Sequence, residues 1–177
     1  MSGGHLFVDE TKRRDYLLVA GVVVPADLDA VRKIMRGLVL PGQRRLHMKD
    51  ENDSRKRSIV TAIAVSGVHA TIYDAGRRYR NERERRAACL RAVVQDAAAR
   101  GDSMLVLEQD DSMVSWDNQN LIEFTRASGC RDTLRYEHRR AASELALAIP
   151  DAVAWCWAKG GDWRRRIDPV VTDVRTV

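Results

Sequence analysis

Acidic residues stand at the ends of two apolar segments. HLFVDE, residues 5–10, begins with apolar residues typical of a buried strand and ends on Asp9 and Glu10. MLVLE, residues 104–108, is a continuous apolar strand that ends on Glu108. Strands of a mixed sheet end along shared edges, so acids from two central strands can meet there. Carboxylates in such proximity repel each other, and a cation between them relieves the repulsion.

A third acid, Asp151, begins an almost wholly apolar helix. The segment AVAWCWA that follows it has no polar face for two turns, so the helix is expected to be buried. Burial carries the carboxylate inward, where it needs a partner. Mg²⁺ and Mn²⁺ prefer oxygen ligands, and the chain has no Cys/His cluster that suits a softer metal. The sequence therefore predicts a Mg²⁺ or Mn²⁺ site formed by Asp9, Glu10, Glu108 and Asp151.

Two histidines and one more acid fit roles around such a site. His47, in LHMKDE, can carry a proton near neutral pH, and its alternative is a histidine hydrogen-bonded within a loop. Asp117 and His138 are expected in an outer shell, with a structural or phosphate-positioning role as the alternative for His138. Taken singly, each strand-end acid is also explained as a solvated turn residue, and Asp151 as a helix cap.

The net charge of +5 points to an anionic partner. Of 30 basic residues only five are Lys, and the planar guanidinium of Arg suits phosphate. In WRRRI, residues 163–167, no acid is interleaved, so Arg164 and Arg165 are the predicted phosphate contacts. In the longer run at 76–86, i,i+4 pairs such as Glu82 with Arg86 indicate a solvated helix face. Nucleic acid is the expected partner, and a protein partner or a homo-oligomer is the alternative.

The chain is expected to be one domain, residues 1–177, in a reducing cytoplasm. No apolar run approaches the ~20 residues that a membrane helix needs, and MSGGHLF does not resemble a signal peptide. The cysteines are three in number and scattered, so neither a disulfide framework nor a zinc site is predicted. We expect no contact with a membrane.

Hydrophobic periodicity predicts a mixed α/β fold. A β-hairpin is expected from residues 5–9 and 16–24, and further strands at 68–76 and 104–108. Helices are expected at 28–38, 53–65 and 81–100, and near 117–126 and 141–158.

Several of these motifs together resemble the bacterial family catalogued as domain of unknown function 3800. The resemblance runs from about residue 6 to residue 171, and it is carried by FVDE with its hairpin, Leu46-His47, Leu107-Glu108, Asp117 and above all IPDAVAWCWAKGGDWRRRI. An RNase H-like fold and nuclease activity are ascribed to that family. The resemblance thus implies an RNase H-like mixed sheet that opens with a β-hairpin and is flanked by helices. Many relatives read D-E-S-G where this chain reads Asp9-Glu10-Thr11-Lys12, a difference in the turn after the acids.

By position, the resemblance makes Asp9 the first-strand aspartate, Glu108 the carboxylate of a later central strand and Asp151 the aspartate of the C-terminal helix. It implies a two-metal nuclease, in which ions ~4 Å apart activate water and stabilise the leaving 3′ oxygen. Asp9, Glu108, Asp151 and His47 would be catalytic, with Glu10 or Asp117 completing the ligand shell. The alternative is a noncatalytic RNase H-like module that binds nucleic acid or a protein partner, its acids serving as caps and turn residues.

Overall fold

The predicted hairpin forms the centre of one six-stranded mixed sheet. The computed structural model describes residues 3–177. Strands β1 (His5–Thr11) and β2 (Tyr16–Val23) pair antiparallel, and β3 (His69–Gly76) adds antiparallel to β2. On the other side of β1, β4 (Met104–Glu108) runs parallel to it. Two parallel edge strands complete the order β5-β4-β1-β2-β3-β6, namely β5 (Arg135–Arg139) and β6 (Val171–Thr176).

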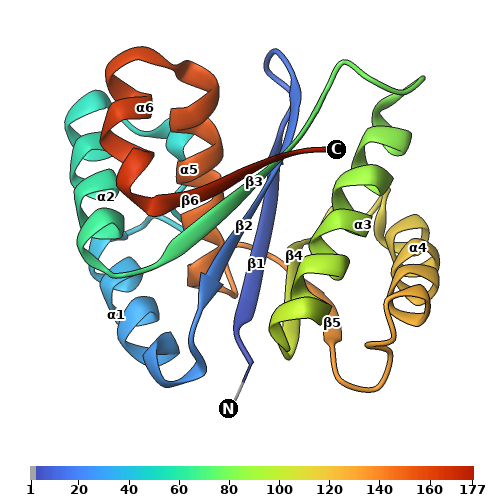
Figure 1. The fold of residues 1–177 in the computed structure, drawn as a ribbon. Helices are drawn as coiled ribbons and strands as arrows, with labels where there is room; N and C mark the ends of the chain where they lie inside the picture. The colour runs from blue at the N-terminus through green and yellow to red at the C-terminus, as the bar shows by residue number, and fades with distance from the viewer. Residues whose placement is uncertain (1–2) are drawn as a thin grey trace.

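Helices cover both faces of this sheet (Figure 1). One face carries α1 (Leu28–Leu38), α2 (Asp53–Val65), α5 (Ala148–Lys159) and α6 (Gly161–Ile167). The other face carries α3 (Glu82–Arg100) and α4 (Val114–Ala127). The Asn side chains that precede α2 and α3 accept hydrogen bonds from backbone N–H groups of the first turn, and Gly101 ends α3 with a left-handed φ of 73°. The predicted α/β class is confirmed.

Two hydrophobic cores lie on the two faces, and β1 contributes to both by alternation. Phe7 packs into the core under α5, whereas Leu6 and Val8 pack into the core under α3. In β4, likewise, Val106 faces the α5 side and Leu107 the α3 side. Successive strand residues point to opposite faces, so this parity also decides where the acids that follow will point.

The main differences from the predicted elements lie in the second half of the chain. The edge strands β5 and β6 were not predicted, because RYEHR and VTDVRT are too polar to read as buried strands. The helix expected near 141–158 begins only at Ala148, after a 3-10 turn at Leu145–Leu147 that the Glu144 side chain caps. It ends at Lys159, where Gly160 takes a positive φ of 76°.

Candidate active site

Asp9 and Glu108 lie side by side near the C-terminal ends of the neighbouring strands β1 and β4. Strands β1 and β4 are parallel, and the paired residues Val8 and Leu107 directly precede the two acids. By strand parity both carboxyls point to the α5 side, as Phe7 does. The two carboxyls are close enough for the charge of Glu108 to raise the pKa of Asp9, and both line the same cavity. One oxygen of Asp9, Oδ1, accepts the Glu10 backbone N–H at 2.7 Å, which fixes the orientation of the carboxyl.

Asp151 brings the third carboxylate from the first turn of α5. Its Oδ2 accepts the Met48 backbone N–H at 2.9 Å, and its side chain is only 15% exposed. Burial raises the pKa of Asp9 well above its usual value, and the charges of Glu108 and Asp151 raise it further. Burial also raises the pKa of Asp151, although the Met48 hydrogen bond opposes this. The structure therefore brings together three of the four predicted metal-binding acids.

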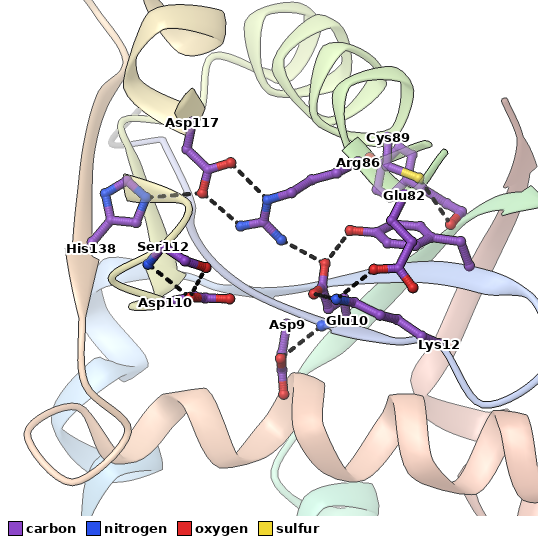
Figure 2. A network of polar contacts seen from close by, with 12 residues as sticks. Asp9, Glu10, Lys12, Glu82, Arg86, Cys89, Asp110, Ser112, Asp117 and His138 are labelled. Carbon is purple, nitrogen blue, oxygen red and sulfur yellow. Dashed lines mark hydrogen bonds and ion pairs between the residues drawn. The ribbon is translucent and has the colours of Figure 1, made fainter. Parts of the chain in front are cut away.

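Glu10, the fourth, points to the opposite face of the sheet, contrary to the prediction (Figure 2). Its Oε2 accepts hydrogen bonds from Arg86 Nη1 at 2.6 Å and from the Tyr16 hydroxyl, and its Oε1 lies 3.3 Å from Lys12 Nζ. The physical reason is strand alternation: if Asp9 faces α5, its neighbour faces α3. Glu10 is therefore a partner of Arg86 and not a ligand beside Asp9.

Asp117 and His138, the predicted outer-shell residues, belong to the same network as Glu10, on the opposite side of β1 from the Asp9 carboxyl (Figure 2). Both oxygens of Asp117 accept hydrogen bonds from Arg86, from Nε and Nη2, each at 2.7 Å. His138 Nε2 donates to Asp117 Oδ2 at 3.1 Å, since an ionised carboxylate can only accept. Together with Glu10, these side chains hold the Arg86 guanidinium at the edge of the sheet. Arg86 in turn lines a cavity that also contains Asp9 and Glu108.

His47 lies between two carboxylates. Its Nε2 is 3.5 Å from Asp151 Oδ1, and its Nδ1 is 3.1 Å from Asp50 Oδ2. The side chain is 30% exposed, so it connects Asp151 to solvent. This placement is suited to the predicted proton transfer, and Asp50 is a positioning partner that the sequence analysis did not single out.

Arg45 was also missed, and it binds the candidate site directly. Its Nη1 lies 2.6 Å from Glu108 Oε1. No feature of QRRLH distinguishes Arg45 from Arg44 before the fold is known. The guanidinium supplies positive charge to one of three crowded carboxylates, and so offsets part of their repulsion.

The donor chemistry of the three acids fits Mg²⁺ or Mn²⁺, because all are hard oxygen ligands whose mutual repulsion a cation would relieve. Within residues 3–177, however, no group of three or more His, Cys, Asp or Glu side chains is already arranged as a metal site. The partners explain this: Glu108 is turned to Arg45, and Asp151 is held by Met48. Metal binding would thus require Glu108 to exchange Arg45 for the ion.

Replacing Arg45 by Ala tests this exchange. In EDTA we expect the variant to lose about 1 kcal/mol of folding free energy, the upper end for partly exposed ion pairs. In saturating Mn²⁺ the loss should shrink, because the ion supplies positive charge to the same carboxylates. Urea unfolding under both conditions measures the difference, with Arg44→Ala as the matched control. Equal losses with and without Mn²⁺ would separate Arg45 from the metal chemistry.

Arg164 and Arg165 are not brought to these acids. Arg164 Nε and Nη2 donate to the Trp157 carbonyl at 3.2 and 2.9 Å, and the guanidinium lies 4.4 Å from the centre of the Trp157 ring. Arg165 Nη2 lies 3.5 Å from Asp162 Oδ1, and Asp162 directly precedes the WRRRI segment. Arg164 therefore covers the C-terminal end of α5, and the predicted phosphate contact through this pair is not supported by their positions.

No protein family matches the chain, and no curated protein matches it. The resemblance to the domain of unknown function 3800 therefore stays a prediction, and function has to be argued from the side chains. Among residues 3–177, no helix is both long enough and apolar enough to cross a bilayer.

Proposed function

We propose that the chain is a Mg²⁺- or Mn²⁺-dependent nuclease that hydrolyses phosphodiester bonds, with Asp9, Glu108 and Asp151 as the metal-binding acids. The observation that carries this proposal is the crowding of three carboxyls around the half-buried Asp9, whose pKa is raised by burial and by the charges of Glu108 and Asp151. Carboxylates crowded together at a strand end repel one another and so oppose folding, and a bound cation would remove this repulsion.

Phosphodiesters are the favoured substrate class because cations border the acids. Arg45 contacts Glu108, and Arg86 lines the cavity that contains Asp9. Exposed Arg13 and Lys49 line the cavity that contains Asp151. Guanidinium groups beside a metal-binding carboxylate cluster suit a substrate that bears negative charge on each repeating unit. The mixed sheet with an opening hairpin is also the arrangement that the family resemblance implies.

In the proposed hydrolysis, the carboxylates, His47 and Arg45 have different roles. A bound Mg²⁺ or Mn²⁺ would supply Lewis acidity, activating water and stabilising the leaving oxygen. In Asp9, Oδ1 accepts the Glu10 N–H and the other oxygen would bind the metal. In Asp151, Oδ2 accepts the Met48 N–H and Oδ1 would bind the metal. His47 Nε2, next to that Oδ1, is placed to take up or deliver a proton. Arg45, once released from Glu108, is placed to bind a phosphate oxygen.

A metal titration followed by thermal unfolding tests the proposal. Mn²⁺ or Mg²⁺ at a hundred times its Kd should stabilise the native protein by ~2.7 kcal/mol. The stabilisation should be larger at pH 8 than at pH 5.5, because protons compete with the metal for carboxyls whose pKa values are raised.

The control for this titration is Asp162→Asn, which removes an exposed acid of α6 that pairs with Arg166. It should respond to metal as the wild type does. A melting temperature unchanged by millimolar metal, together with no cleavage of single-stranded or duplex RNA or DNA, would favour the noncatalytic module instead.

A further inference from the structure

Three cavities adjoin one another along the sheet edge that carries the acids. The middle cavity, of about 220 Å³, is lined by Asp9, Glu108 and Arg86. A cavity of about 290 Å³ lies on the side of Asp151, and another of about 220 Å³ lies on the side of α3. Glu10 lines all three, so they are neighbours around one residue of β1. The acids therefore have space on both sides.

The cavity on the Asp151 side combines positive charge with an aromatic wall. Arg13 and Lys49 line it, both are exposed, and neither forms an ion pair within residues 3–177. Trp155 forms part of the wall, and its ring is held by the edge of Trp163 at a centroid distance of 5.2 Å. The two exposed cations are suited to phosphate groups. The Trp155 ring packs against the core and has Lys56 Nζ 4.4 Å from its centre, so it serves as a wall of the cavity.

The cavity on the α3 side carries charges of both signs, with Lys12, Arg83 and Arg86 opposite Glu10, Glu82 and Asp110. It is lined by Lys12 and Arg83, which is exposed and has no ion-pair partner in the described part of the chain. Lys12 lies 3.3 Å from Glu10 and 3.0 Å from Glu82. Arg86 and Glu10 form the boundary with the middle cavity, since they line both. Cations thus stand on either side of the carboxylate cluster.

We propose, on the basis of the nuclease function above, that one single polynucleotide strand passes through all three cavities and is cut internally. Phosphates on one side of the scissile bond contact Arg13 and Lys49, and a phosphate on the other side contacts Arg83. The three cavities measure about 220 to 290 Å³ each, so the proposed ligand is a strand laid across them and not a molecule enclosed by one of them. The exposed rims leave both directions open, so no strand end has to be recognised.

Binding to a variant that cannot cut tests the path of the strand. In an Asp9→Asn background, Arg13→Ala, Lys49→Ala and Arg83→Ala should each weaken the anisotropy-measured affinity for a labelled oligothymidylate 3- to 10-fold. Each should also lower the slope of log K against log salt by about 0.7, the value per phosphate contact on a single strand. Arg14→Ala, the exposed neighbour of Arg13 that does not line the three cavities, is the matched control and should change neither.

Two results would overturn the path. One is an equal loss of affinity in Arg14→Ala, which would indicate a diffuse basic surface. The other is a competition result. If polyglutamate displaces the labelled oligonucleotide at the same concentration of negative charge as unlabelled oligothymidylate does, an acidic protein segment is the better candidate for the ligand.

Cleavage of a circular strand tests internal cutting. With Mn²⁺, single-stranded circles and linear strands of the same sequence should be cut at rates within a few-fold of each other. Cleavage of linear strands alone would overturn internal cutting and leave the nuclease function standing. Cleavage of neither would overturn the nuclease function, and the binding results above would then decide the path of the strand by themselves.

Discussion

Asp9→Asn is expected to stabilise the metal-free protein while reducing cleavage more than 100-fold. Loss of cleavage follows from removal of a metal ligand, since changes in groups that only orient ligands already reduce activity ~10–100-fold. The gain in stability follows from the raised pKa of Asp9, which means that ionising this carboxyl opposes folding. Asn keeps an oxygen for the Glu10 N–H and removes the charge. We expect a gain of ~0.5–2 kcal/mol at neutral pH.

The gain should depend on pH with a definite sign. Below the usual carboxyl pKa of 3.8, Asp9 is neutral in both the folded and the unfolded chain, and Asn brings no advantage. As pH rises toward the higher pKa of the folded state, the wild type alone pays an increasing penalty. Urea unfolding in EDTA at pH 5 and pH 8 should therefore show the larger difference at pH 8.

Glu10→Gln is the matched control, because it removes one negative charge from the next residue of the same strand. Glu10 binds Arg86 and Lys12, so this variant should be less stable than the wild type. Opposite signs at adjacent acids would separate a functional carboxylate from a structural one. If the Asp9→Asn protein is less stable than the wild type in EDTA, and the wild type cuts no substrate, both acids have a structural role only.

The sequence predicted the elements that have strong periodicity and clear ends. The helix Leu28–Leu38 and the strand Met104–Glu108 have the predicted bounds, because their apolar spacing is regular. The convergence of Asp9 with Glu108 followed from the rule that strand ends share an edge. That Glu10 points away also follows from strand alternation, which the sequence analysis did not apply to it.

Arg86 shows what sequence spacing alone leaves undecided. A partner at i,i+4, Glu82, made the solvated helix face a reasonable prediction, whereas the structure pairs Glu82 with Lys12. Arg86 lies four residues before Leu90 and seven before Val93, on the buried stripe of α3, and this signal was present in the sequence. Its partner Asp117 lies 31 residues further along, and only the tertiary fold brings it there.

The Arg86 network leads to the second large effect, a loss of ~3–5 kcal/mol of folding free energy in Asp117→Asn. Asp117 is 1% exposed and Arg86 9%, and two hydrogen bonds of 2.7 Å join them. Asn leaves Glu10 as the only carboxylate that still contacts the buried Arg86 guanidinium among the described residues, and the loss of the second counter-charge dominates the effect. Urea unfolding measures it. Asp162→Asn, which breaks an exposed Asp–Arg pair of 2.8 Å, should change the stability far less.

The pH dependence of this loss distinguishes the ion pair from simple packing. Burial tends to raise the pKa of Asp117, but hydrogen bonds from Arg86 and His138 outweigh it and hold the pKa below its usual 3.8. A carboxyl with a lowered pKa stabilises the fold above the unfolded pKa, and that contribution disappears as pH falls through the folded value. The difference between wild type and Asp117→Asn should therefore be constant from pH 8 to pH 5 and shrink below about pH 4. A difference that persists unchanged at pH 3 would mean that Asp117 acts through its shape and not through its charge.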